Sequence, residues 1–222
     1  MLKEFLLDLL FPKFCLGCKK EGSFLCQDCL ATINFAREPL IFKKEILEKV
    51  YFIADYSNPV LKKAILQFKY EPFLKELAKD FGKLFEIYFQ ILAEKPNFSN
   101  FILVPIPLDK KRENWRGYNQ SEQLARVLSK LLKIPLMSNL LLKKRKTLPQ
   151  ILFKEKERKE NIKDAFFIAV PEKVKGGSFL LVDDVFTTGA TMREAAKVLK
   201  EGGAKKIWGI VLAVAKIGEE LI

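Results

Sequence analysis

The chain has 222 residues and a net charge of +12, and 49% of its residues are hydrophobic and 12% aromatic. This composition is typical of a globular protein with one α/β core and a small appendage, and it excludes a disordered chain. The absence of histidine excludes Ser-His and Cys-His catalysis, a histidine general base and a histidine-ligated metal within this chain.

The first element is an apolar stretch at residues 2–11 that also carries three charged side chains. Its apolar positions fall on one helical face, which predicts a docking helix, with a helix lying on a membrane surface as the alternative. Its uninterrupted apolar runs are far shorter than the about 20 residues that a transmembrane helix needs. It also lacks the uncharged core and cleavage site of a signal peptide. We therefore expect a cytoplasmic protein without a transmembrane segment.

Four cysteines follow in two Cys-x2-Cys knuckles, which pair Cys15 with Cys18 and Cys26 with Cys29. This spacing predicts a closed tetrahedral site for a structural Zn²⁺ ion. Two disulfides and an iron–sulfur cluster are the alternatives, and a reducing cytoplasm disfavours disulfides. Metal binding at such a site supplies folding energy, so removal of the metal should unfold this zinc ribbon.

The sequence divides into the amphipathic helix and zinc ribbon at residues 1–34, a charged linker at residues 35–50, and a larger domain at residues 51–222. Strands are predicted at residues 50–55, 101–106, 178–182 and 207–214. Helices are predicted at residues 59–69, 73–93, 120–132 and 190–201. This alternation predicts an α/β fold with a mainly parallel sheet flanked by helices.

The buried strand at residues 178–182 runs into a loop that ends where a helix begins. Amides and the dipole at a helix N-terminus favour a phosphate, and a pair of carboxylates suits the vicinal hydroxyls of a ribose. The residues of this predicted site are Asp183, Asp184, Thr187, Thr188, Gly189, Ala190 and Thr191. A strand–turn–helix with two capping aspartates is the alternative. No Walker or dinucleotide-binding glycine motif occurs in the chain.

With these residues the sequence resembles the type I phosphoribosyltransferases, whose signature is a hydrophobic strand, two acidic residues, two variable residues and a Thr-Thr-Gly-x-Thr-like loop. The resemblance implies that Asp183 and Asp184 bind the ribose 2- and 3-hydroxyls of phosphoribosyl pyrophosphate. It also implies that residues 187–191 wrap the 5-phosphate, and that Mg²⁺ neutralises the pyrophosphate. Thr187 stands where several 6-oxopurine transferases carry an acidic general base, which argues against hypoxanthine or guanine salvage.

A second loop follows the strand at residues 101–106, and the resemblance assigns pyrophosphate binding to it. The candidate residues for the pyrophosphate are residues 105–108, which include Pro105, Ile106 and Pro107. Lys111 and Arg112 follow as candidates for the substrate-binding rim of this site, and a solvated basic turn before an N-capped helix is the alternative. By analogy with the fold, residues 143–160 form a mobile cover that excludes water.

Positive charge gathers in the middle of the chain, where residues 108–163 hold 16 basic side chains against six acidic ones. This segment predicts either a solvated surface or a contact with pyrophosphate or a nucleic-acid backbone. The nucleic-acid candidates are Lys143, Lys144, Arg145, Lys146, Arg116, Trp115 and Tyr118. The two aromatic residues could stack on bases or pack in the core.

The order of motifs is similar to that of the ComF/GntX family of competence-associated phosphoribosyltransferase-like proteins over nearly the full length. After the cysteine ribbon these motifs are, in order, Ala54-Asp55-Tyr56, Gln67-Phe68-Lys69-Tyr70 at the end of a helix, Val104-Pro105-Ile106-Pro107-Leu108, Arg116-Gly117-Tyr118-Asn119-Gln120, Lys146-Thr147-Leu148-Pro149-Gln150, Glu157-Arg158-Lys159-Glu160-Asn161-Ile162 with Ala165-Phe166, and the Asp183-Asp184 loop.

The ComF/GntX resemblance implies a phosphoribosyltransferase in which an undetermined acceptor displaces pyrophosphate from C1 of the ribose. It also implies a link to the handling of single-stranded DNA in natural transformation. The alternative is a non-catalytic single-stranded DNA-binding module that uses the phosphoribosyl site for a ligand or a DNA 5-phosphate. The implied partners are phosphoribosyl pyrophosphate, single-stranded DNA and the competence helicase machinery, with a peripheral association with the uptake apparatus.

Overall fold

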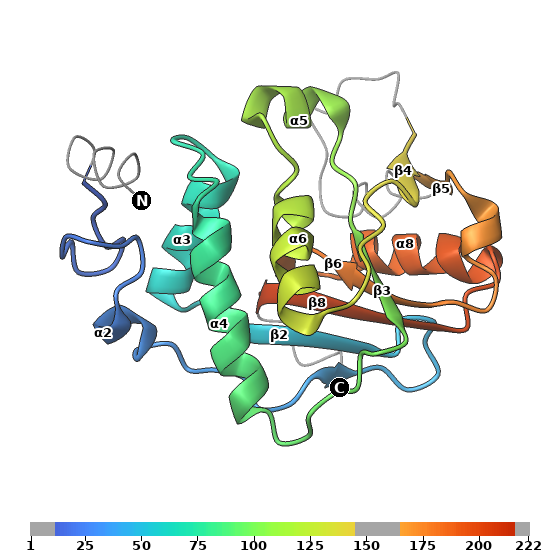
Figure 1. The fold of residues 1–222 in the computed structure, drawn as a ribbon, viewed down its shortest axis with the longest axis horizontal. Helices are drawn as coiled ribbons and strands as arrows, with labels where there is room; N and C mark the ends of the chain where they lie inside the picture. The colour runs from blue at the N-terminus through green and yellow to red at the C-terminus, as the bar shows by residue number, and fades with distance from the viewer. Residues whose placement is uncertain (1–11, 145–164, 216–222) are drawn as a thin grey trace.

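The computed structural model describes residues 12–144 and 165–215, which form a mainly parallel sheet with helices on both faces (Figure 1). The strands of this sheet are β1 (Leu40–Ile41), β2 (Lys49–Asp55), β3 (Phe101–Pro105), β6 (Ser178–Val182), β7 (Val185–Phe186) and β8 (Lys206–Val214). Their order is β1-β2-β8-β6-β3, and β7 also pairs with β8. Strand β1 runs antiparallel to β2, and the other pairs are parallel. The predicted fold class is confirmed.

The described helices are α2 (Gln27–Leu30), α3 (Pro59–Lys69), α4 (Leu77–Ile91), α5 (Lys110–Arg116), α6 (Gln120–Leu132) and α8 (Ala190–Glu201). The predicted bounds of α3, α6 and α8 are confirmed. Helix α4 starts four residues later than predicted, because Phe73 has a φ of +54° and cannot lie in a right-handed helix. Helix α5 is not among the predicted helices. It forms because Asp109 caps its first turn and Gly117 ends it.

Two hydrophobic cores lie on opposite faces of the sheet, because side chains alternate along each buried strand. Leu180 of β6 and Ile210 of β8 belong to the core that α3, α4 and α6 cover. Leu181 and Val211 belong to the core that α8 covers. The central strands are therefore buried on both sides, as their continuous apolar runs predict.

Residues 35–50, predicted as a linker, take part in this sheet and in its second core. They contain β1, and Phe42 and Leu47 are buried against the α8 side of the sheet. Charged residues of this segment are interspersed with apolar ones, and the apolar side chains are buried against the edge of the sheet because this removes them from water.

A small antiparallel ribbon of β4 (Leu141–Lys143) and β5 (Phe166–Ile168) stands beside the main sheet. The predicted cover at residues 143–160 begins at the end of β4, and its residues 145–160 lie outside the described part of the chain. The predicted N-terminal helix at residues 2–11 also lies outside it. Within the described ranges, no helix has both the length and the apolar character to cross a bilayer.

Candidate functional site

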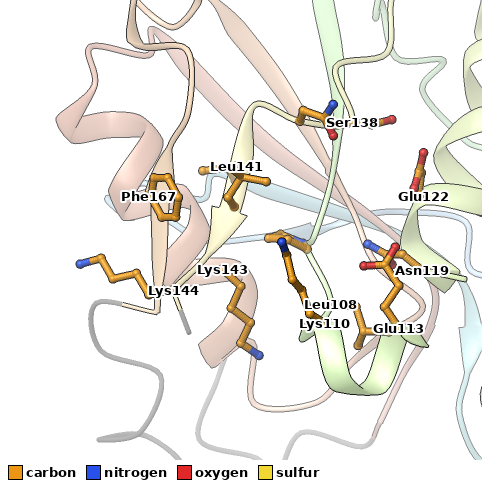
Figure 2. Close-up of a pocket in the computed structure, with 13 residues that line it drawn as sticks. Leu108, Lys110, Glu113, Asn119, Glu122, Ser138, Leu141, Lys143, Lys144 and Phe167 are labelled. Atoms are coloured by element: carbon orange, nitrogen blue, oxygen red, sulfur yellow. The ribbon is translucent and has the colours of Figure 1, made fainter. Parts of the chain in front are cut away.

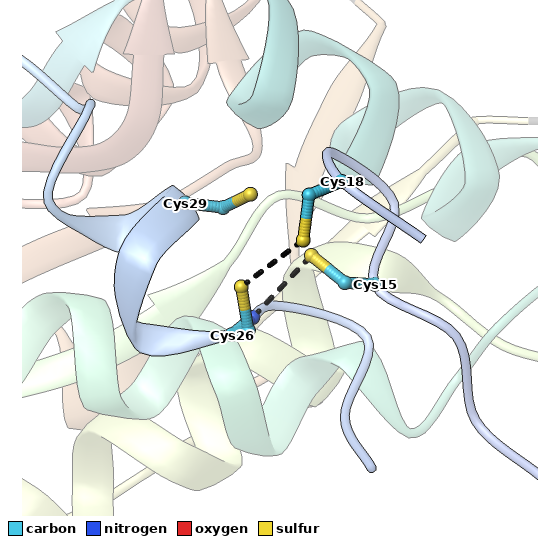
Figure 3. A group of neighbouring side chains, drawn as sticks. All are labelled: Cys15, Cys18, Cys26 and Cys29. Atoms are coloured by element: carbon cyan, nitrogen blue, oxygen red, sulfur yellow. Dashed lines mark hydrogen bonds between the residues drawn. The ribbon is translucent and has the colours of Figure 1, made fainter. Parts of the chain in front are cut away.

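The four cysteine side chains converge on one point at the end of the molecule that carries α2 (Figures 1 and 3). Their sulfur atoms all lie within 4.8 Å of one another, and Cys18 Sγ is 3.5 Å from Cys26 Sγ. A tetrahedral Zn²⁺ with Zn–S bonds of about 2.3 Å separates its sulfurs by about 3.8 Å. The four cysteines are free thiols, which does not agree with the disulfide alternative. The geometry is consistent with a structural zinc ion.

The electrostatics of the cluster also fit a cation. Burial would raise the pKa of the Cys15 thiol, but the backbone amides of Cys26, Cys18 and Gly17 lower it to about 6. The neighbouring Cys15 sulfur, together with burial, raises the pKa of Cys29 to about 12. Four negative sulfurs therefore cannot coexist at neutral pH unless a positive ion compensates them.

The cysteine module is fixed to the N-terminal end of α3. A Cβ atom added at Gly17 would lie 2.5 Å from Cys29 Sγ and 3.3 Å from a methyl group of Val60. Glycine therefore lets the first knuckle approach both the second knuckle and α3. Asn58 joins the two parts, because its side chain caps α3 at Leu61 and donates to the carbonyl of Thr32.

The loop at residues 187–191 that we predicted to bind phosphate, called the phosphate loop below, lies beyond the carboxyl end of β6, before α8. Gly189 has a φ of +72° directly before the first residue of α8, and a Cβ there would lie 2.2 Å from the Phe186 ring. The side chains of Thr187 and Thr188 are exposed around it. A hollow of about 30 Å³ opens beside this helix N-terminus, lined by Asp183, Val185, Phe186, Thr187, Gly189, Ala190, Thr191 and Met192. Glycine and the open helix end together form a site suited to an anion.

Arg193, in the first turn of α8, holds this loop by a hydrogen bond to its backbone. Its Nη1 donates to the Thr188 carbonyl at 2.6 Å, and its Nε donates to a Glu45 carboxylate oxygen at 2.8 Å. The guanidinium also lies over the rings of Phe42 and Phe186. The segment predicted as a linker therefore supplies two of the groups that hold the loop.

Asp183 and Asp184 lie between β6 and β7. Both of these strands pair with β8, and the two aspartates separate the paired stretches. Both hydrogen bonds that described residues donate to Asp183 reach Oδ1, from the Ser121 hydroxyl at 2.8 Å and from the Asp184 amide at 2.9 Å. Asp184 is 2% exposed. The Lys69 ammonium at the end of α3 contacts Asp184 Oδ1 at 2.7 Å, and Asp184 Oδ2 has no hydrogen-bond partner among the described residues.

The charges of this site depend on one another. Burial raises the pKa of Asp183 to about 7, and the Asp184 carboxylate adds to this effect, while Lys69 and Ser121 oppose it. Burial alone would lower the pKa of Lys69, but the Asp184 carboxylate, with Asp183, raises it. Lys69 therefore stays a cation, and the pair carries less negative charge than two free carboxylates.

The loop after β3 is tied to this acidic pair through the start of α6. The Ile106 amide donates to the Val182 carbonyl, and the Asn119 side chain donates to the Ile106 carbonyl. Asn119 also caps α6 at Ser121, whose hydroxyl reaches Asp183. The two predicted ligand loops, at residues 105–107 and 183–191, therefore lie at neighbouring strand ends, as their positions in a parallel sheet predict.

A larger pocket of about 300 Å³ adjoins the loop after β3 (Figure 2). Its walls are Pro107 and Leu108, the helix starts of α5 and α6, and the β4–β5 ribbon. Lys110, Lys143 and Lys144 bring positive charge to it from two elements. Lys111 and Arg112, predicted for the pyrophosphate, are exposed on α5 and do not line this pocket, whereas their neighbour Lys110 does.

The nucleic-acid candidates have separate positions in the structure. Trp115 is 56% exposed and packs its ring edge-on against Phe73. Tyr118 is buried and its hydroxyl donates to the Phe68 carbonyl, so this ring cannot stack on a base. Arg116 is buried, pairs with Gln120 and has an Nε without a hydrogen-bond partner in the described chain. Arg145 and Lys146 lie outside the described residues.

The topology and the two ligand loops define a class of protein. Residues 72–221 match the family of phosphoribosyl transferase domains, and the chain belongs to this family. The predicted resemblance is therefore confirmed, together with the type I phosphoribosyltransferase-like fold.

More specific relatives are competence and DNA utilization proteins. The chain is 29% identical to "Competence protein ComFC" of Bacillus subtilis over 81% of this chain and 67% of that protein. It is 29% identical to "DNA utilization protein YhgH" of Escherichia coli over 87% of this chain and 85% of the relative. It is 38% identical to "Competence protein F" of Haemophilus influenzae over 50% of each chain, so that match spans only half of the relative.

Among solved structures, a glutamine phosphoribosylpyrophosphate amidotransferase from B. subtilis matches with a TM-score of 0.44 and 17% identity. The match covers 66% of this chain and 30% of the other.

Sequence reasoning missed Lys69, Ser121, Arg193 and Glu45. Ser121 carries a weak signal, because Asn119 before it is a helix N-cap residue at the start of a predicted helix. Lys69 belongs to the Gln67-Phe68-Lys69-Tyr70 motif of the family resemblance, but the sequence assigned it no role in the site. Its role depends on where the end of α3 meets the end of β6, which spacing along the chain does not reveal.

Proposed function

We propose that this protein binds phosphoribosyl pyrophosphate and acts as a phosphoribosyltransferase on a nitrogen nucleophile. The observation that carries the proposal is the position of Asp183 beside the phosphate loop, since both line the same hollow at the start of α8. In this proposal the ribose hydroxyls meet the acidic pair while the 5-phosphate meets the helix N-terminus. The family membership supports the same ligand.

The pocket beside the loop after β3 then receives the pyrophosphate end of the ligand. Lys110, Lys143 and Lys144 would compensate its charge, and the backbone of residues 105–107 would hold its oxygens. In the transfer, the C1–O bond breaks and its electron pair leaves with pyrophosphate. The nucleophile forms a C1–N bond and afterwards loses its proton to solvent or to the leaving group.

Magnesium fits this arrangement as an ion carried by the pyrophosphate rather than by the acidic pair. Lys69 already provides a positive charge at Asp184, so the carboxylates do not need a metal to compensate them. Mg²⁺ supplies charge neutralisation of the pyrophosphate as it leaves. The chain's own part is to orient the ribose and to hold both phosphate groups.

The test is a thermal shift with phosphoribosyl pyrophosphate and Mg²⁺. At about 100 times Kd, binding to the native state should add about 2.7 kcal/mol to its stability, which raises Tm by several degrees. Asp183→Asn and Asp184→Asn should abolish the shift. Glu201→Gln, at the opposite end of α8 and exposed, is the control that should keep it. A wild-type protein whose Tm does not move would refute the site assignment.

The names of the relatives support a role in competence and DNA utilization, and we place the protein in the cytoplasm, where cysteine clusters stay reduced for metal. Single-stranded DNA, the competence helicase machinery and the uptake apparatus are the proposed partners. Pyrophosphate release, screened against bases, nucleosides and single-stranded DNA, would identify the acceptor.

The second candidate function is a non-catalytic single-stranded DNA-binding module. The exposed Trp115 on the basic helix α5 favours it, because an exposed indole beside lysines offers a stacking surface for bases. On this hypothesis, Trp115→Ala weakens oligothymidine binding several-fold, and the affinity falls steeply with salt. A salt-independent affinity would rule this function out.

A further inference from the structure

Among the described residues, the side-chain and backbone donors that reach each carboxylate of the acidic pair contact one oxygen only. Ser121 and the Asp184 amide both donate to Asp183 Oδ1. Lys69 contacts Asp184 Oδ1 at 2.7 Å. Asp184 Oδ2 is buried and has no partner among the described residues. A buried carboxylate oxygen without a donor is costly, so an acceptor left open at a binding site is a place where a ligand can supply the missing hydrogen bond.

Lys69 is well placed to fix the carboxylate because its own helix end is held firmly. The Tyr118 hydroxyl donates to the carbonyl of Phe68, directly before Lys69. The Phe68 ring packs against the rings of Phe81 and Tyr118 in the core. The backbone from which Lys69 extends is therefore anchored in the core, and its ammonium contacts Oδ1 of Asp184 rather than Oδ2.

We propose that Lys69 is a positioning residue that holds Asp184 by Oδ1, so that Oδ2 accepts a ribose hydroxyl and the site selects sugars with the vicinal diol. This inference rests on the proposed phosphoribosyl site and goes beyond it, because it assigns the sugar selectivity to a residue of α3. The neutral hydroxyl is the group that fits, since Lys69 already compensates the charge of Asp184 and leaves little attraction for a second cation.

By the same reasoning, Ser121 is a positioning residue for Asp183, and its effect on sugar binding should be weaker than that of Lys69. A hydroxyl donor is neutral, whereas the ammonium makes a charge-assisted contact that is roughly twice as strong. The raised pKa of Lys69 agrees with an ammonium that remains charged at neutral pH. Arg116 is a second buried cation whose charge acts on Asp184, but no direct contact ties it to that carboxylate.

The experiment compares two ligands by calorimetry on the full chain. Ribose 5-phosphate carries both hydroxyls, and 2,3-dideoxyribose 5-phosphate lacks them while keeping the phosphate. In Lys69→Met we expect ribose 5-phosphate to bind about tenfold to hundredfold more weakly, the range of a lost charged hydrogen bond. The dideoxy sugar should change by less than about twofold, because its contacts to the phosphate loop remain.

Two further variants keep the experiment decisive if Lys69→Met does not fold. Lys69→Arg retains a charged donor and should recover part of the selectivity, and Ser121→Ala should reduce it by less than Lys69→Met does. Lys79→Met, on the exposed side of α4, is the matched control and should bind both sugars as the wild type does.

The outcomes separate this inference from the proposed function. If the wild type binds neither sugar, both the phosphoribosyl site and the role of Lys69 are refuted. If the wild type binds ribose 5-phosphate but the Lys69 variants weaken both sugars equally, Lys69 acts on the phosphate or on the fold, and only the inference fails. Unchanged binding of both sugars in the Lys69 variants would also refute the positioning role of Lys69.

Discussion

The cysteine module and the acidic pair, Asp183 and Asp184, lie at opposite ends of α3 and are built in opposite ways. The four cysteines come from residues 15–29, so their ligand set is local in the sequence. The acidic pair depends on groups from α3, α6, β6 and β8, which are far apart along the chain. About 14 Å of helix separates Val60, beside the cysteines, from Lys69, beside Asp184.

This contrast shows how two kinds of site respond to change. A local metal site either closes completely around its ion or does not form, because each ligand is indispensable to the tetrahedron. A dispersed site can lose one supporting residue and keep its shape, because the sheet and helices that carry it are stable by themselves. We therefore expect large, all-or-none effects at the cysteines and graded effects at the acidic pair.

The largest effect should come from Cys15→Ser. Structural zinc contributes about 10–16 kcal/mol of apparent binding free energy in small zinc modules, and this variant removes a buried ligand. We expect loss of bound zinc, measured by elemental analysis, and a large fall in Tm. Lys20→Ala is the control, since both side chains of its ion pair with Asp28 are largely exposed and the pair should contribute little. A variant that keeps one zinc per chain would contradict a four-cysteine site.

A smaller effect is expected from Gly189→Ala in the phosphate loop. The added Cβ would collide with Phe186 and would lie in the left-handed region, so overpacking should cost about 1–3 kcal/mol besides the backbone strain. Gly176→Ala is a matched control, with a φ of +74° and open space around the new Cβ. Urea unfolding should show a clearly larger loss at Gly189, together with lost binding of ribose 5-phosphate. Equal losses at the two glycines would contradict a crowded loop.

The pH dependence of stability tests the acidic pair without a ligand. The folded protein keeps the Asp183 proton until the pKa of about 7, whereas an ordinary aspartate loses it near 3.8. The folded state thus binds more protons between these values, so the free energy of unfolding should fall as pH rises through this window. Asp183→Asn should flatten this slope in urea titrations. The hypothesis fails if both proteins lose stability in parallel.

The smallest effect should follow Glu45→Gln in the segment between the two regions. Glu45 is partly exposed, so its ion pair with Arg193 contributes at most about 1 kcal/mol after solvent screening. We expect an almost unchanged Tm but a loss of a few-fold in ribose 5-phosphate affinity, because Arg193 then holds the Thr188 carbonyl less firmly. Glu38→Gln, which is exposed in the same segment, should bind like the wild type.

The sequence alone was enough for the elements whose signals are local. Three helices have the predicted bounds because their caps and apolar spacing are encoded within a few residues, as Asn58 and Asn119 show. The Asp183–Thr191 loop could be identified because a buried strand, two acids and a helix start follow one another directly. The cysteine knuckles could be identified for the same reason.

Tertiary structure decided the rest. Ser121 and Arg193 are ordinary polar residues of amphipathic helices in the sequence, and Lys69 belongs to a motif without an assigned role. All three acquire a role only when the crossovers of the sheet bring α3, α6 and α8 to one edge. Glu45 and Phe42 looked like linker residues until the edge of the sheet buried their neighbours. Contacts between distant residues depend on chain topology and on burial, and the spacing of residues along the chain does not determine either of them.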